Sequence, residues 1–89
     1  AYKNTVVKSF SPELDIRGMY GDDACFMLDK YLDDAALAGI HTVRIIHGKG
    51  TGALRKAVHA VLRRNKAVKD FRLGVYGEGE SGVTVVTLK

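Results

Sequence analysis

The sequence predicts an α/β fold, a two-layer sandwich with the element order β-α-β-α-β-β. Two segments with helical periodicity alternate with short runs rich in β-branched residues, which is the pattern of helical crossovers between parallel strands. The last two β-rich runs are separated by a glycine-rich turn, which favours a hairpin. A chain of 89 residues suffices for one domain of this kind. We therefore expect the first three strands to be parallel and the last to be antiparallel.

The first strand and the first helix have clear local signals. Residues 13–17 alternate between apolar and polar side chains, which predicts a short strand. Asp22 or Asp23 can cap the following helix, which we expect to end at about Ala38, before Gly39. Residues at helical spacing predict its buried stripe: Ala24, Met27, Leu28, Tyr31, Leu32 and Ala35.

The second half of the chain repeats the alternation of strand and helix. Residues 42–46 predict a strand, and a loop with three glycines then leads into a basic helix over about 53–64. The predicted apolar stripe of that helix consists of Leu54, Val58, Val61 and Leu62. Residues 70–76 predict the third strand, 77–82 a turn and 82–88 the fourth strand.

Composition indicates one folded domain over residues 13–89. Residues 1–12, with the only proline, are interpreted as a leader or linker that contains a short extended piece at 5–8. Hydrophobic residues make up 46% of the chain and charged residues 27%, which excludes disorder. No apolar run approaches the ~20 residues of a membrane span, and no signal peptide is recognisable. The single Cys25 excludes an internal disulfide, so we expect a cytoplasmic protein in which Cys25 is a small core residue.

The net charge of +4 is unevenly distributed along the chain. Residues 1–34 hold four Lys or Arg and seven acids, and residues 70–89 hold two Lys or Arg and three acids. Residues 35–69 hold eight Lys or Arg and no acid. Such a block is typical of a face that binds a polyanion, although a solvated helix face is the simpler alternative. Its absence of acids favours nucleic acid.

The loop after the second strand has the properties of an anion site. It begins at His47 and continues with Gly48, Lys49, Gly50, Thr51 and Gly52. Glycines let backbone N–H groups approach an anion, and the following helix N-terminus adds partial positive charge. Asp15 and Arg17 end the first strand, and the carboxyl ends of parallel strands meet at one edge of a sheet. We therefore expect both segments to lie close together.

Two short motifs carry a resemblance to a known family. Residues 14–18 read Leu-Asp-Ile-Arg-Gly and resemble the Leu-Asp-x-Arg-Gly motif of the Smr (small MutS-related) domain, although many members carry Leu at the position of Ile16. Residues 47–52 read His-Gly-Lys-Gly-Thr-Gly and resemble that family's His-Gly-x-Gly-x-Gly motif. Residues 82–86 are similar to its closing strand, so the resemblance covers about residues 13–89.

The resemblance implies a domain that nicks DNA or, in some members, cuts RNA. It implies a fold similar to the C-terminal domain of translation initiation factor three. It also implies a larger parent chain, a bacterial MutS-like protein of the second family, linked to suppressing recombination and to acting on stalled ribosomes. DNA, structured RNA and the ribosome are therefore the expected partners, and a membrane is not. The oligomeric state stays open.

The family motif assigns chemistry to four residues. Phosphodiester hydrolysis needs an activated water, stabilisation of charge on the phosphate oxygens and a protonated leaving oxygen. Asp15 would orient the water or hold one divalent cation, Mg²⁺ or Mn²⁺, and His47 would act as general acid or base. Arg17, Lys49 and the N–H groups of residues 48–52 would bind the phosphate. The structural alternatives are a pairing of Asp15 with Arg17 and a hydrogen bond from His47 that holds the loop.

Further residues of the basic block are candidate contacts to the nucleic-acid backbone. They are Arg55, Lys56, Arg63, Arg64 and Lys66. His41 and His59 are interpreted as ordinary surface or helix residues. No Cys and His cluster has the spacing of a zinc site, and a single acid is few for two-metal catalysis. The loop fits a relaxed dinucleotide fingerprint, but the chain is too short for that fold.

Two hypotheses of function follow from these residues. The first is an endonuclease that acts on DNA or structured RNA through Asp15, Arg17 and His47. The second is a non-catalytic module that recruits a larger MutS-like ATPase to nucleic acid or to the ribosome. Both predict binding through the phosphate backbone, which carries little sequence information.

Overall fold

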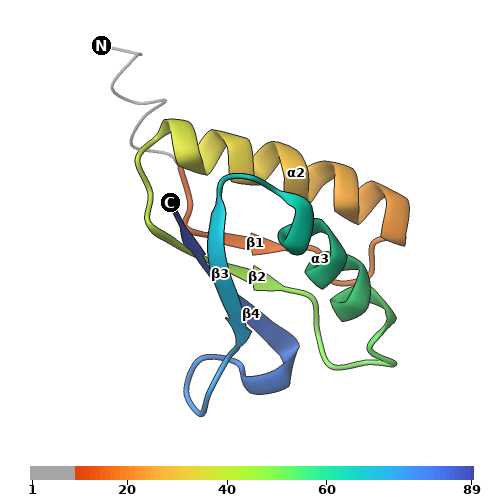
Figure 1. Ribbon diagram of the computed structural model, residues 1–89. Coiled ribbons are helices and arrows are strands. Elements are labelled where there is room, and N and C mark those ends of the chain that lie inside the picture. The colour runs from red at the N-terminus through yellow and green to blue at the C-terminus, as the bar shows by residue number, and fades with distance from the viewer. Residues whose placement is uncertain (1–9) are drawn as a thin grey trace.

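The computed structural model describes residues 10–89, so the extended piece expected at 5–8 lies outside the described residues. Figure 1 shows the elements in order. They are β1 (Glu13–Asp15), α2 (Gly21–Leu37), β2 (Thr42–Ile46), α3 (Ala53–Arg64), β3 (Val68–Leu73), the short 3₁₀ helix η1 (Glu80–Gly82) and β4 (Val83–Leu88). None of the described helices is both long and apolar enough to cross a membrane.

The four strands form one sheet in the order β1-β2-β4-β3. β1 is parallel to β2, and β4 is antiparallel to both of its neighbours, β2 and β3. β3 therefore has the same direction as β1 and β2, which confirms the predicted fold class. β4 lies between β2 and β3, an order of strands that no local sequence signal specifies. This insertion brings the C-terminal strand beside the end of β2.

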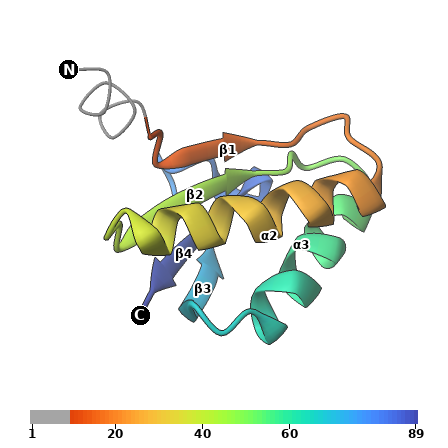
Figure 2. The same cartoon turned by 90° about the horizontal axis from the view of Figure 1, so that it is seen from above.

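The two faces of the sheet have different surroundings. Both helices cover one face, here called the helix face, and the other is the open face (Figure 2). Ile45 pairs with Thr84 across β2 and β4, and both are fully buried on the helix face. The next residue, Ile46, pairs with both Asp15 and Val83, so these three lie on the open face. This alternation decides to which face of the sheet each side chain of the site points.

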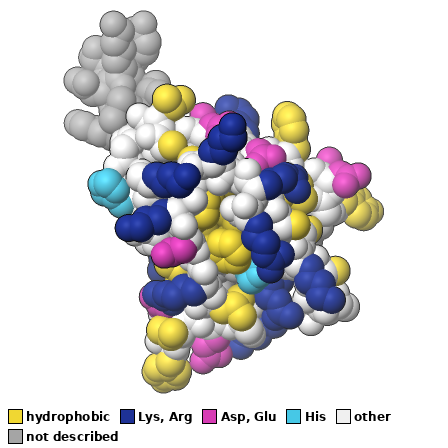
Figure 3. Space-filling model, in the orientation of Figure 1, with side chains coloured by type: hydrophobic (Ala, Val, Ile, Leu, Met, Phe, Trp, Pro, Cys, Tyr) yellow, Lys and Arg dark blue, Asp and Glu magenta, His cyan; other side chains and the backbone are white. Residues whose placement is uncertain are grey.

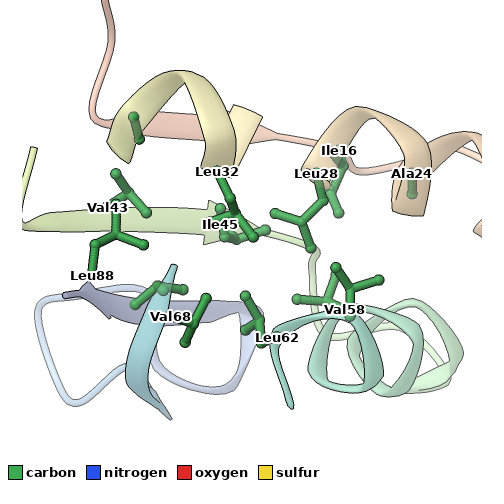
Figure 4. Packing of buried hydrophobic residues seen from close by; sticks show 13 residues of the cluster. Ile16, Ala24, Leu28, Leu32, Val43, Ile45, Val58, Leu62, Val68 and Leu88 are labelled. Atoms are coloured by element: carbon green, nitrogen blue, oxygen red, sulfur yellow. The ribbon is translucent and has the colours of Figure 1, made fainter. Parts of the chain in front are cut away.

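The hydrophobic core lies between the sheet and the two helices. Figure 4 shows Leu28 of α2, Ile45 of β2 and Val58 of α3 pointing into this space. The predicted stripes are largely buried, with Ala24, Leu28, Leu32 and Ala35 on α2 and Val58, Val61 and Leu62 on α3. Met27 is 42% exposed, and Tyr31 and Leu54 are half-buried at the margins of their stripes.

The first elements of the described residues differ from the prediction in two places. β1 ends at Asp15 rather than Arg17, because the Asp15 carboxylate accepts the Arg17 backbone N–H at 3.1 Å and turns the chain. The prediction that Asp22 or Asp23 caps α2 was wrong. The N-cap residue is Tyr20, which supplies no side-chain cap. Both acids lie in the first turn, where their negative charge interacts favourably with the positive end of the helix.

β3 begins earlier than predicted, at Val68 rather than Asp70, and ends at Leu73. The side chain of Asn65 accepts the Ala67 N–H at 2.8 Å, so the chain reverses directly after α3. At the other end, the Glu78 carboxylate accepts hydrogen bonds from the Val75 N–H and from the Arg72 guanidinium. These contacts close a turn that contains Tyr76, which was predicted to belong to the strand.

Two segments near the domain margin also have defined contacts. Phe10 stacks on Tyr31 with ring centroids 5.3 Å apart, and the Tyr31 hydroxyl donates to the Ser11 carbonyl at 2.7 Å. Residues 10 and 11, assigned to the leader, thus pack against α2. Cys25 is half-buried between the helices, and its thiol faces the Ala57 carbonyl.

We predict that the core depends strongly on Leu28. Leu28→Ala removes a fully buried side chain and leaves a cavity, so the free energy of unfolding should fall by about 3 kcal/mol. Urea denaturation followed by circular dichroism measures this change. The matched control is Leu37→Ala on the same helix, where the side chain is 87% exposed and the effect should stay below about 0.5 kcal/mol. Equal losses in both variants would contradict this assignment of the core.

Candidate nucleic-acid interface

The turn after β1 and the loop after β2 meet at one edge of the sheet (Figures 1 and 2). The closest approach is between Arg17 and Gly48. A Cβ atom on Gly48 would lie 3.4 Å from the Arg17 Cγ atom, so the arginine stem lies against the glycine backbone. Gly48 also has φ +82°, a conformation that favours glycine. The structure thus brings the two motifs together, as the parallel strands predicted.

Arg17 and Asp15 form a bidentate ion pair at this edge. The Arg17 Nη2 atom donates to Asp15 Oδ2 at 2.6 Å, and Nε donates to Oδ1 at 3.0 Å. Hydrogen bonds from the Arg17 side chain and backbone lower the pKa of Asp15 to about 2. The same contact raises the pKa of the Arg17 guanidinium. Both side chains are largely exposed, so the pair stays accessible to a ligand.

The first residues of the glycine loop are attached to the C-terminal part of the chain. The Gly82 carbonyl accepts two backbone hydrogen bonds, from His47 N–H at 3.1 Å and from Gly48 N–H at 2.9 Å. The Lys49 Nζ atom donates to Glu80 Oε1 at 3.1 Å, and both side chains are more than half exposed. Because exposed pairs of this kind are weak, Lys49 can exchange Glu80 for a phosphate.

The loop ends at the N-terminus of α3, which has no acidic group. The N-cap residue Gly52 has φ +86° and supplies no side-chain cap, and no acid lies in the first turn. The Thr51 hydroxyl accepts the Ala53 N–H at 3.3 Å. A Cβ on Gly52 would lie 3.0 Å from Arg55 Nη2, so the guanidinium lies over the cap. The positive end of the helix is thus available to an anion.

Two hollows flank Gly48 and Lys49. A cleft of about 380 Å³ lies between the turn at 18–21 and the loop at 47–55. A second hollow of about 360 Å³ lies between Arg17, Lys49 and the turn before β4. Tyr20 lines the first cleft and is 83% exposed, which the sequence analysis did not single out.

His47 points away from Asp15. Its side chain is only 5% exposed and lies on the helix face, whereas Asp15 lies on the open face. The Nδ1 atom is 2.9 Å from the Gly48 carbonyl oxygen, and Nε2 is 2.8 Å from Thr84 Oγ1. Protein groups therefore occupy both ring nitrogens. The predicted role as general acid or base stays a prediction, and the contacts favour the alternative in which His47 holds the loop.

His59 lies in α3, as expected, but it makes specific buried contacts that the sequence did not indicate. It is half-buried under β4 and β3, with Nε2 2.8 Å from Thr84 Oγ1 and its ring centroid 4.9 Å from that of Phe71. Burial lowers its pKa, and the nearby His47, Arg63 and Arg55 lower the pKa further. Its spacing of three from Leu62 was the signal that placed it at the edge of the apolar stripe.

Most of the basic block is free of ion pairs within residues 10–89. Arg44 pairs with Glu13 on the open face, and Lys49 pairs with Glu80. The remaining six cations have no acidic partner among the described residues: Arg55, Lys56, Arg63, Arg64, Lys66 and Lys69. Figure 3 shows Lys and Arg side chains prominent on the face that carries α3. Arg63 and Arg64 lie at the far end of α3, about 12 Å from Arg55 along the helix axis.

The described residues do not fit a metal centre built from protein ligands. They contain no group of three or more His, Cys, Asp or Glu side chains that could hold an ion. Asp15 is the single carboxylate that the motifs predicted as a ligand, and both of its oxygens accept hydrogen bonds from Arg17.

These features define a small α/β domain with a glycine loop and two cationic side chains at the edge of a parallel strand pair. The Smr domain family matches residues 14–89, nearly the whole chain. The chain therefore belongs to the Smr domain family, which confirms the resemblance of its two motifs.

The curated relatives are much longer proteins. The chain is 58% identical over 85 residues to a protein named Endonuclease MutS2 from Caldanaerobacter subterraneus, covering 96% of this chain and 11% of the relative. It is 55% identical over 91 residues to Endonuclease MutS2 from Caldicellulosiruptor bescii, covering all of this chain and 12% of the relative. The chain thus spans about a tenth of the length of these relatives.

Two solved structures have the same fold. The crystal structure of the Smr domain of Thermus thermophilus MutS2 has a TM-score of 0.84 and 47% identity, covering 86% of this chain and 96% of that one. YdaL, a stand-alone small MutS-related protein from Escherichia coli, has a TM-score of 0.83 at 24% identity, covering 88% of this chain and 64% of that one. The expected similarity to translation initiation factor three stays a prediction.

We predict that Arg17 controls the titration of Asp15. The carboxyl should titrate at about pH 2, and Arg17→Gln should move its pKa up towards 3.8. Because the folded pKa is lowered, the ion pair stabilises the fold fully above about pH 4 and loses this effect as the pH falls through about 2. Carboxyl ¹³C NMR shifts measure the midpoint.

Lys30→Gln is the control for this titration, because Lys30 pairs with Asp34 on α2 and not with Asp15. Its Asp15 midpoint should equal that of the wild type. A wild-type midpoint near 3.8, unchanged in Arg17→Gln, would contradict the pairing.

Proposed function

We propose that this domain binds DNA or structured RNA through the phosphate backbone and cleaves it as an endonuclease. The observation that carries the proposal is the contact of the Arg17 side chain with Gly48. It joins Arg17, Lys49 and the N-terminus of α3 into one cationic edge, which suits a phosphate group. The name Endonuclease MutS2, which the relatives carry, supports the same reading.

The cations of α3 would extend this edge along a nucleic-acid strand. Arg55 and Lys56 lie in the first turn, and Arg63 and Arg64 lie in the last. Their separation of about 12 Å along the axis corresponds to three or four steps of about 3.4 Å along a duplex. Binding would therefore depend on salt and on the shape of the backbone more than on base sequence.

Arg17, Lys49 and the loop amides would stabilise the charge that develops on the phosphate oxygens during hydrolysis. Asp15, with a pKa of about 2, is ionised at neutral pH and is a weak proton acceptor. We infer that it orients an attacking water by a hydrogen bond, while Arg17 positions its carboxylate. His47 would contribute mainly by holding Gly48, and a direct role in proton transfer would require it to leave Thr84.

In a longer MutS2-like parent, such an endonuclease activity would act in the cytoplasm, in suppressing recombination or on stalled ribosomes.

The cleavage assay described below also tests whether cleavage depends on a divalent cation, with Mg²⁺ and Mn²⁺ as the candidate ions.

A specific observation supports a second function, a binding module without catalysis. Both oxygens of Asp15 accept hydrogen bonds from Arg17, and both ring nitrogens of His47 have partners within the protein, Gly48 and Thr84. No free proton-transfer group of the motifs then faces the phosphate edge. Such a domain would recruit its parent to nucleic acid or to the ribosome.

We predict that Asp15→Asn lowers the cleavage rate about 10²-fold or more, because it removes the group that orients the water. Nucleic-acid affinity should change less than threefold, because the cationic edge remains. The assay incubates the purified domain with supercoiled plasmid or a structured RNA, with and without Mg²⁺ or Mn²⁺. His47→Ala and Lys49→Gln are tested in parallel, and a melting curve accompanies each variant.

Asp33→Asn is the matched control, because this carboxylate is exposed on α2, outside the motifs. Its cleavage rate should equal that of the wild type. Binding without any cleavage, or cleavage that is equal in Asp15→Asn and Asp33→Asn, would replace the endonuclease with the binding module.

A further inference from the structure

Two histidines and a threonine form a buried chain of hydrogen bonds behind the glycine loop. Thr84 Oγ1 lies 2.8 Å from Nε2 of His59 and 2.8 Å from Nε2 of His47. The other ring nitrogen of His47, Nδ1, lies 2.9 Å from the Gly48 carbonyl oxygen. Thr84 is fully buried and His47 is 5% exposed. This series of hydrogen bonds therefore runs from His59 of α3 through Thr84 of β4 and His47 to Gly48, the first glycine of the loop.

The chemistry of these groups determines where each proton lies. The Gly48 carbonyl can only accept, so the Nδ1 atom of His47 carries a proton and donates it. In neutral His47 the Nε2 atom is then an acceptor, and the Thr84 hydroxyl donates to it. The same hydroxyl oxygen accepts from His59, whose Nε2 must be protonated. Every donor in this order has an acceptor, and every buried side-chain polar atom of residues 10–89 has a partner.

A second proton on His47 would break this order. Its Nε2 would then donate to Thr84, whose own O–H would have no acceptor in His47, and none in His59 as long as the Nε2 atom of His59 keeps its proton. A buried hydroxyl without a partner is costly. The positive charge would also lie beside His59, whose pKa is lowered first by burial and further by His47, Arg63 and Arg55.

We propose that Thr84 and His59 are positioning residues that hold His47 in its Nδ1–H tautomer and thereby hold the Gly48 carbonyl in place. Gly48 is the residue against which Arg17 lies, and its neighbour Lys49 is the second cation of the phosphate edge. The buried chain thus sets the shape of the anion site from the opposite face of the sheet. Its effect on nucleic-acid affinity rests on the proposed function, whereas the tautomers do not.

The first test is the tautomer of each histidine in the wild-type chain. Long-range ¹H–¹⁵N NMR at neutral pH should show the Nδ1–H form for His47 and the Nε2–H form for His59. The opposite tautomer of His47 would overturn the proposal, whatever the domain does to nucleic acid. If Thr84 and His59 only filled space, they would not select one tautomer, and His47 would show a mixture of both forms.

The second test removes only the hydroxyl. Thr84→Val keeps the shape, so the proposal expects mixed tautomers of His47 and an affinity for a short DNA duplex or RNA hairpin about tenfold weaker. Thr84→Ser should restore both properties. Thr87→Val is the matched control, because Thr87 is a half-buried residue of the same strand on the open face, and it should behave as the wild type.

The outcomes separate this proposal from the proposed function. Unchanged tautomers and affinity in Thr84→Val would overturn the positioning role. If Thr84→Val does not fold, the wild-type and Thr84→Ser spectra decide. A wild type that binds neither probe but has the expected tautomers would remove the proposed function and leave the hydrogen-bond chain intact.

Discussion

The glycine loop depends on one backbone acceptor, the carbonyl oxygen of Gly82. It accepts the N–H groups of His47 and Gly48 in succession and ties the end of β2 to the start of β4. This contact exists because β4 lies between β2 and β3 in the sheet. The loop is therefore held by the residue directly before the last strand, although 33 residues separate Gly48 from Gly82. Gly48, held in this way, is the residue against which Arg17 lies and from which the loop continues through Lys49 to α3.

The sheet separates the candidate site into an exposed, charged face and a buried face that supports it. Asp15 on the open face and Arg17 and Lys49 at the edge are exposed and charged. His47 and Thr84 lie on the helix face and are buried among the core residues. This separation follows from the alternation of side chains along β2, since Ile46 and His47 are consecutive. The two motifs meet through the backbone of Gly48 and not through contact of Asp15 with His47.

Much of the fold was predictable because its signals are local. The buried stripes of α2 and α3 follow from helical periodicity, and the loop residues at 47–52 indicate an anion site by their glycines alone. The convergence of Arg17 with Gly48 follows from two parallel strands that end at one edge. The wrong strand boundaries lie where a side chain, rather than a neighbouring strand, accepts the backbone N–H group. The Asp15 carboxylate ended β1 early, and Asn65 started β3 early, since a side-chain hydrogen bond at either place redirects the chain.

The order of strands and the role of His59 needed the tertiary structure. No local signal tells that β4 inserts between β2 and β3, and the contacts of Thr84 with both histidines exist only because of that insertion. The ion pair of Lys49 with Glu80 likewise joins residues that are distant in sequence. The cationic edge was therefore predictable, and the buried support behind it was not.

The most direct test of the central claim is a titration of the ¹⁵N-labelled domain with a short DNA duplex, followed through its backbone amide signals. The account predicts that the largest shifts occur at Arg17 and over residues 48–55, with smaller shifts along α3. The acidic face of α2 should not respond. Shifts centred on α2, or on the open face away from Arg17 and Lys49, would contradict the assignment of the phosphate site.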